Sequence, residues 1–423
     1  MALIAGMGAT TTAPGSPIYP LALATPITSE TLNAVRALTA WVLQRERATQ
    51  AGSELPSAPE ALRQQLETLS SATLLRAIQR HRLESLLQSD PGVGNLLPDL
   101  RGDLQRAARR EAMAALALAS LTREMAVLFA EAGIPLLVIK GIPFALQTTG
   151  SLTARGRGDC DLFVDPSQVG EAIALLQAAG FVLSNGASCV GDDSIRGRYS
   201  RFVSIEISLQ RDFGGWRQHI DLHWHATHAR GVLPGFQVLW QRGEVLHING
   251  QPVRTLLHRD AMVHACCHAA TDRWMALRNM VDIERIGRAL PSAQLVGLRR
   301  IRPVRKSWQA IACAFEGNNA SWSVGRAHAV RMKAEVAQQR PWRSLGDGQW
   351  TKTNRLRFFF HAMNLSHHPV HICSMLLHQL MPPADLVDQQ TGEVRSLWQA
   401  LLWRGGKLRN RLQAQAESPG RPA

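Results

Sequence analysis

The sequence has few of the features that mark a cross-linked protein. Six cysteines are spread over 423 residues, with no C-x-x-C pair and no regular spacing. Disulfide frameworks belong mainly to small secreted domains, so scattered cysteines in a long chain are typical of reduced thiols. We therefore expect a cytoplasmic protein that does not depend on disulfides.

Long hydrophobic runs and leader signals are missing as well. No uninterrupted apolar stretch reaches the roughly 18–20 residues that cross a bilayer, and the first residues lack the basic segment and apolar core of a signal peptide. A P-loop of the form G-x-x-x-x-G-K-S/T is absent. Gly156 and Gly158 precede a predicted strand, whereas a Rossmann fingerprint opens a helix. These absences predict a soluble protein without a membrane span and argue against two common nucleotide-binding folds.

Negative charge is in short supply. Asp and Glu total 33 against 47 for Lys and Arg, which gives a net charge of +14 at pH 7. Such a surplus attracts polyanions, so nucleotides, nucleic acid, anionic lipid or an acidic partner are all compatible with it, as is a solvated basic face. A chain of 423 residues with 45% hydrophobic residues is long enough for two or three domains with a sizeable core.

Local patterns divide the chain into four regions. Residues 1–27 are rich in Ala, Thr, Pro and Gly without an amphipathic period, which predicts a disordered leader. Residues 28–132 carry apolar side chains at helical spacing, and residues 251–423 return to a helical, basic pattern. Residues 133–250 hold short apolar or alternating segments between turns. Strands are predicted there at Ile134–Ile139, Asp159–Val164, Phe181–Leu183, Tyr199–Leu209 and His219–His225.

Two carboxylates in this third region carry the strongest chemical signal. Asp159 and Asp161 stand one residue apart in a predicted strand, so both side chains project from the same face. Carboxylates side by side raise each other's pKa unless a cation lies between them. Hard ions such as Mg²⁺ take carboxylate oxygens and leave positions open for phosphate. The pair indicates a metal–nucleotide site, although an isolated D-x-D is more often a turn, a cap or a solvated face.

A second strand supplies a third acid. Within His219–His225, Asp221 and three histidines alternate with apolar residues, so the acid and the histidines share one face. Two-metal nucleotidyl transfer uses carboxylates to hold two ions a few ångströms apart. One ion activates the attacking hydroxyl, and the other neutralises the departing pyrophosphate. Asp221 would complete such a set if its strand lies beside that of Asp161.

Taken together, these motifs resemble the uncharacterised nucleotidyltransferase family of the DNA polymerase β superfamily. The likeness covers roughly residues 70–290. It rests on Lys140-Gly141 after an apolar strand, Arg155, Asp159-x-Asp161, His219-x-Asp221-x-His223-Trp224, and a later helix from His264 to Asp282. The resemblance implies an α+β fold, in which a small mixed-sheet nucleotidyltransferase core is flanked by N-terminal and C-terminal helical regions.

The resemblance also implies roles for individual residues. The expected catalytic acids and metal ligands are Asp159, Asp161 and Asp221. The expected phosphate-binding residues are Lys140, Gly141, Arg155 and Arg157. Residues expected to support the acids or the acceptor are His223 and His268. One departure stands out, because many polymerase-β-type enzymes have Gly-Ser where this chain has Lys140-Gly141.

The implied activity is Mg²⁺-dependent transfer of NMP from an NTP such as ATP to an unidentified acceptor, with two Mg²⁺ ions. The acceptor could be a small molecule, a carbohydrate, a peptide or a protein, and the family leans towards bacterial biosynthetic pathways. Alternatives are a non-catalytic nucleotide- or nucleic-acid-binding module and a partner-binding scaffold. Nucleic acid is a possible partner that the intact acids do not favour. Zinc held by the strand histidines, or by the helical pair His264 and His268 beside Cys266-Cys267, is a further hypothesis.

Overall fold

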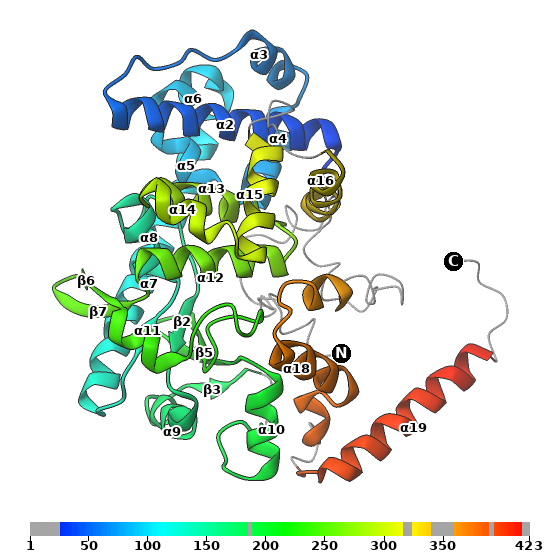
Figure 1. Cartoon of the computed structure of the whole chain (residues 1–423). Helices are drawn as coiled ribbons and strands as arrows, with labels where there is room; N and C mark the ends of the chain where they lie inside the picture. Colours follow the sequence, from blue (N-terminus) through cyan, green and yellow to red (C-terminus); the bar gives the residue numbers. More distant parts are fainter. Residues whose placement is uncertain (1–25, 185–187, 316–323, 340–358, 389–392, 417–423) are drawn as a thin grey trace.

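The computed structural model describes residues 26–184, 188–315, 324–339, 359–388 and 393–416. Almost all of the predicted leader, residues 1–25, lies outside these ranges. Helices gather at the top of Figure 1, and a small sheet lies below them. The predicted α+β fold with helical regions on both sides of a mixed-sheet core is confirmed.

The N-terminal region is a set of helices that pack on one another. Their bounds are α2 Ser29–Ala51, α3 Glu60–Glu67, α4 Ser71–Arg80, α5 Glu84–Ser89, α6 Pro91–Leu96, the short 3-10 helix η1 Pro98–Leu100, and α7 Arg101–Glu131. The side chain of Thr28 caps α2 by accepting a hydrogen bond from the Thr31 N–H, and Gly52 ends the helix with φ +63°. The apolar side chains of α2 that the helical spacing predicted are buried: Leu32, Val35, Leu38, Trp41 and Val42.

A five-stranded mixed sheet forms the centre of the lower part, with strand order β1-β2-β5-β4-β3. Its strands are β1 Leu137–Val138, β2 Cys160–Phe163, β3 Val182–Leu183, β4 Glu206–Phe213 and β5 Trp216–His223. β2 and β5 are parallel, and the other neighbours are antiparallel. Ile220 and Leu222 of β5 are fully buried in one cluster with Met125 and Phe129 of α7. One face of the sheet is therefore covered, and the polar residues of β5 lie on the other face.

One predicted strand is partly a helix. Residues 199–203, expected to begin a strand, belong to α10 Ile195–Val203, and β4 begins at Glu206. Ser194 explains the difference, because its hydroxyl accepts a hydrogen bond from the Gly197 N–H and starts the helix. The alternation that signalled a strand is real only from residue 206 onward.

Short helices and a hairpin complete the sheet layer. They are α8 Gly141–Thr149, η2 Pro166–Gln168, α9 Val169–Ala178, α11 Phe236–Arg242 and the two-stranded hairpin β6 Glu244–Ile248 and β7 Gln251–Thr255. The Thr255 hydroxyl donates to the Val138 carbonyl over 2.6 Å and so ties the hairpin to β1. The hairpin runs across residue 250, where the sequence pattern had suggested a change of region.

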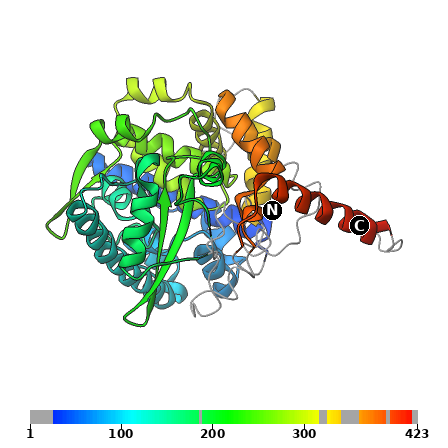
Figure 2. The same ribbon diagram turned by 90° about the horizontal axis from the view of Figure 1, so that it is seen from below.

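The C-terminal helices pack partly on one another, partly on the N-terminal helices and partly on the sheet layer. Their bounds are α12 His258–Thr271, α13 Leu277–Arg288, α14 Ser292–Leu298, α15 Arg302–Phe315, α16 Val324–Gln339, α18 Pro369–Leu380, η5 Pro383–Leu386 and α19 Leu397–Ala416. One hydrophobic cluster joins α2, α4, α12, α13 and α15 to Ile139 and Phe163 of the sheet layer. Both views show α19 extending away from this body (Figures 1 and 2).

One segment of the described residues, Pro98–Glu131, is long and apolar enough to cross a membrane, with 33% of its most apolar window buried. Length and composition alone do not separate a spanning helix from a core helix. In this fold α7 places Met125 and Phe129 in the core beneath the sheet.

Candidate active site

The three predicted acids lie on two adjacent parallel strands. Asp161 of β2 is paired in register with Asp221 of β5, and Asp159 stands directly before β2. Asp161 is only 3% exposed. Asp221 accepts a hydrogen bond from the Ser208 hydroxyl over 2.5 Å, and its Oδ1 lies 3.8 Å from His219 Nδ1. Strand pairing therefore brings together acids that are 60 residues apart in the sequence.

Asp161 is the centre of a chain of charged side chains. Its Oδ1 lies 3.2 Å from His223 Nε2 and 3.8 Å from Lys140 Nζ. Burial opposes its charge, but Lys140 and His223 outweigh burial and hold the pKa of Asp161 well below its usual range. Its second oxygen, Oδ2, is buried and has no hydrogen-bond partner in the described part of the chain. Asp161 is thus a fixed anion with one oxygen left to bind a ligand.

The pKa values of the neighbouring groups are raised, in contrast to that of Asp161. Burial, together with the charges of Asp161 and Asp159, raises the pKa of Asp221. Burial also raises the pKa of Glu206 to about 7. The Nδ1 atom of His223 lies 3.1 Å from Glu206 Oε2, and the charge of Glu206 raises the pKa of His223 even though burial lowers it. The sheet face thus concentrates carboxylates that hold their protons more tightly, as clustered acids do without a bound cation.

No group of three or more His, Cys, Asp or Glu side chains among the described residues is arranged to hold a metal ion. This applies to the three acids and to the two histidine clusters considered for zinc. At the second cluster, burial raises the pKa of Cys267 to about 12, so its sulfur stays a thiol and not the thiolate that zinc binds.

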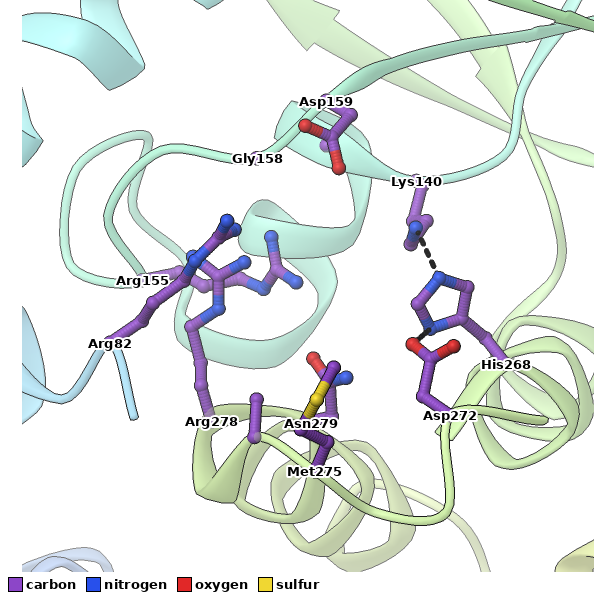
Figure 3. Close-up of a pocket in the computed structure, with 12 residues that line it drawn as sticks. Arg82, Lys140, Arg155, Gly158, Asp159, His268, Asp272, Met275, Arg278 and Asn279 are labelled. Atoms are coloured by element: carbon purple, nitrogen blue, oxygen red, sulfur yellow. Dashed lines mark hydrogen bonds and ion pairs between the residues drawn. The ribbon is translucent and has the colours of Figure 1, made fainter. Parts of the chain in front are cut away.

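A basic pocket opens beside Asp159. Gly141 and Gly158 form part of its wall. The charged or polar side chains that line it are Arg82, Lys140, Arg155, Asp159, His268, Asp272, Arg278 and Asn279. In Figure 3 the three arginines lie together on one side, Lys140, His268 and Asp272 lie on the other, and Asp159 lies above them. Gly141 is the first residue of α8, so the N-terminal N–H groups of this helix face the same region and favour an anion.

Gly141 and Gly158 allow two loops to pass very close to each other. Gly141 has φ +62°, and a Cβ there would lie 2.3 Å from the Asp159 carbonyl oxygen. A Cβ at Gly158 would lie 3.1 Å from the Gly141 Cα. The missing side chain of Gly141 therefore makes room for the Asp159 loop, and the expected contact of Gly141 with phosphate stays a prediction.

Lys140 is oriented by a histidine. Its Nζ donates to His268 Nε2 over 3.0 Å, and His268 Nδ1 lies 3.5 Å from Asp272 Oδ2 (Figure 3). Burial and the Lys140 charge hold the pKa of His268 well below its usual range, so its ring is neutral and accepts this bond. Burial opposes the Lys140 charge, but Asp161 and the other nearby carboxylates raise the pKa of Lys140. A charged lysine is therefore held between Asp161 and the pocket.

The two predicted arginines have different surroundings. Arg155 pairs with the buried Asp282, with Nη2 2.8 Å from Oδ2, and still lines the pocket. Arg157 is outside the pocket lining. Its N–H donates to Glu111 over 3.2 Å, and its carbonyl accepts a hydrogen bond from Arg278. The structure therefore brings Lys140, Gly141 and Arg155 together with the acids but gives Arg157 a role in holding the loop.

Sequence reasoning missed several residues at this site. They are Arg82, Glu206, Asp272, Arg278 and Asn279. For Arg278 a signal was present, because it precedes Asp282 by one helical turn, the spacing at which opposite charges on a helix face each other. No comparable local pattern marks Arg82, which reaches the pocket from the turn after α4.

A mixed sheet with acids paired across parallel strands, beside a basic pocket at a helix N-terminus, defines a nucleotidyltransferase core. The chain belongs to the family of uncharacterised nucleotidyltransferases, whose sequence profile matches residues 68–301, more than half of its length. This confirms the resemblance and supports nucleotidyl transfer as the general activity, with an NTP as the donor. No curated protein matches the sequence. The matched span includes every site residue named above.

Proposed function

We propose that the protein is a Mg²⁺-dependent nucleotidyltransferase that moves NMP from an NTP to a nucleophile, such as a hydroxyl, on an acceptor. One observation supports this proposal more strongly than the others do. Asp161 and Asp221 are paired in register, with Asp159 one step before β2, at the edge of a pocket lined by Lys140 and Arg155. Acids that suit a metal ion and cations that suit phosphate therefore lie next to each other.

By their chemistry, though not by their present arrangement, the donors at the acids suit a divalent cation. Carboxylate oxygens are the ligands that Mg²⁺ prefers, and Asp161 Oδ2 is buried without a hydrogen bond. Asp159, Asp161 and Asp221 are the residues that would hold it. When bound, Mg²⁺ offsets charge on the phosphates and lowers the pKa of the attacking hydroxyl.

The remaining chemistry belongs to the side chains of this chain. Lys140 and Arg155 bind phosphate oxygens of the NTP in the pocket and offset their charge. Asp221, whose side chain is 16% exposed, orients the acceptor hydroxyl and takes up its proton. The new bond joins the acceptor oxygen to the α-phosphorus as the bond from that phosphorus to pyrophosphate breaks. Pyrophosphate departs into the basic pocket.

Label transfer tests this proposal. Protein, Mg²⁺ and an acceptor pool would be incubated with NTP labelled at the α-phosphate or at the γ-phosphate. We expect transfer of the α label and not of the γ label, with loss of transfer in Asp161→Asn. Asp212→Asn is the control, because Asp212 is an exposed acid on the β4–β5 hairpin that carries Asp221. Transfer of the γ label, or equal α transfer by Asp161→Asn, would contradict nucleotidyl transfer at this site.

A non-catalytic nucleotide-binding module is the second candidate. It is favoured by the Lys140–Asp161 contact and by the lack, among the described residues, of side chains arranged as a metal site. Such a module would bind NTP in the pocket without label transfer, and Asp161→Asn would leave its NTP affinity unchanged. If the protein is an enzyme, we expect label transfer, and we expect Asp161→Asn to change the NTP affinity.

A further inference from the structure

We propose that Arg82, Arg155 and Arg278 form a subsite for the terminal phosphates of the donor, separate from the acids. Its ligand chemistry is a polyphosphate chain, supplied either by an NTP or by released pyrophosphate. The inference rests on the proposed function only for the identity of that donor.

The three arginines come from three parts of the chain and meet at one wall of the pocket. Arg82 lies in the turn between α4 and α5, Arg155 in the loop between α8 and β2, and Arg278 in the first turn of α13. Figure 3 shows their guanidinium groups side by side, across the pocket from Lys140. A planar guanidinium binds two phosphate oxygens at once, so this wall suits a phosphate group better than an isolated lysine does.

The cluster brings buried positive charges close together. Arg155 and Arg278 are 6% and 7% exposed, so water screens their repulsion weakly. Burial and the charges of Arg155 and Arg82 lower the pKa of Arg278 to about 9. The Nε of Arg278 is buried and has no hydrogen-bond partner in the described residues. Asp282 and Glu111 offset part of this charge, and a bound anion would offset more.

Arg82 occupies a backbone position that favours glycine. It follows the C-terminus of α4 with φ +55°, and its N–H donates to the Gln79 carbonyl over 3.1 Å. At such a position glycine is preferred, because a side chain there is strained. An arginine at this point is therefore better explained by what its side chain binds than by the turn.

The pocket places this subsite where the terminal phosphates of a bound NTP would lie. Asp159 and Lys140 border the pocket on the side of the acids, and the arginines border it opposite Lys140 (Figure 3). An NTP with its α-phosphate at the acids would extend its terminal phosphates towards the arginines. The family match also runs from residue 68 to residue 301, well beyond the sheet, and it includes both Arg82 and Arg278.

Calorimetric titration of sodium tripolyphosphate into the full chain, without divalent metal, tests the subsite. We expect Arg82→Gly and Arg278→Met each to weaken binding by about tenfold or more, since each removes charge-assisted hydrogen bonds. Arg106→Met, which removes an exposed arginine of α7, should bind as the wild type does. Arg82→Gly suits the left-handed turn, so it should keep its thermal midpoint even if Arg278→Met fails to fold.

Two results would overturn the subsite. One is equal tripolyphosphate binding by the wild type and Arg82→Gly. The other is an equally large loss of metal-free binding in Asp161→Asn, which would place the anion at the acids. Inorganic pyrophosphate is titrated in parallel to distinguish the two sources. A subsite that holds the released product as well as the donor binds both pyrophosphate and tripolyphosphate, whereas a subsite for the donor alone binds only tripolyphosphate. Tripolyphosphate binding that depends on the arginines, in a protein that transfers no α label, would support the subsite and contradict only the proposed function.

Discussion

Asp161 keeps its negative charge in a place where burial works against it, because Lys140 and His223 lie beside it. Lys140 is in turn held by His268. The charge of each residue therefore depends on the next, and a single substitution changes the surroundings of its neighbours. Local sequence could predict the strands that carry Asp161 and Asp221, and the role of these acids stays a prediction. It could not predict the contact between Lys140 and His268, which are 128 residues apart.

A double-mutant cycle tests whether His268 acts by positioning Lys140. Lys140→Ala should weaken NTP binding by about tenfold, because it removes a charge-assisted contact to phosphate. His268→Ala should weaken it less, since the lysine remains but is no longer oriented. The double variant should be no worse than Lys140→Ala alone, and calorimetry measures all four proteins. Fully additive losses would show that the histidine contacts the nucleotide independently.

Asp272 gives polyphosphate binding a pH dependence. Burial raises the pKa of Asp272 to about 7. The side chain is therefore mostly neutral near pH 6 and mostly ionised near pH 8, where its negative charge in the pocket repels an anion. Asp272→Asn should bind tripolyphosphate more tightly than the wild type at pH 8 and similarly at pH 6. Ionisation of the ligand affects both proteins equally. An equal difference between the two proteins at both pH values would contradict this assignment.

The turn between β1 and α8 shows how an element positions the acids. The alternation in β5 and the apolar run before Lys140 were enough to predict β5, the edge strand β1 and the face that carries Asp221. The start of β4 was predicted wrongly, because the capping residue Ser194 extends a helix into the predicted strand. The contact between the Gly141 turn and the Asp159 loop also could not be predicted, since it depends on the distance between two strands and not on either sequence.

Substituting two glycines separates backbone strain from loop contact. Gly141 and Gly150, at the two ends of α8, have φ +62° and +66°. A Cβ at Gly150 meets nothing within 4 Å, whereas at Gly141 it meets the Asp159 carbonyl at 2.3 Å. Gly150→Ala should lower the free energy of unfolding by about 1–2 kcal/mol through its left-handed backbone alone and leave transfer unchanged. Gly141→Ala should lose more stability in urea and also lose transfer. Equal effects would show that the close approach is unimportant.

Across the whole molecule, the helical regions are part of the site. The hydrophobic cluster that contains α2 also contains Ile139 and Phe163, which flank the acids. Ion pairs between Glu46 of α2 and Arg285 and Arg288 of α13 connect the two helical regions directly. The sequence indicated helical regions on both sides of the sheet, but it gave no sign that Arg82 and Arg278 meet. That meeting depends on tertiary packing between segments about 200 residues apart.

Removal of the first helices should therefore unfold the core. A chain that begins at Arg101 lacks α2 to α6, and it would expose the buried faces of Ile139, Phe163 and α13 to water. We expect it to be insoluble or to lack a cooperative thermal transition by circular dichroism, whereas a chain that begins at residue 26 should melt as the full chain does. A truncated protein that melts cooperatively would show that the core folds without its N-terminal helices.

We infer that the paired acids and the basic pocket form one metal-dependent nucleotide site. Calorimetric titration of ATP, GTP, CTP and UTP into the protein, with and without Mg²⁺, tests it most directly. We expect Mg²⁺ to tighten the binding of at least one NTP, and this tightening to be lost in Asp159→Asn/Asp161→Asn. Failure of the folded wild type to bind any NTP, or tightening that persists in the double variant, would contradict it.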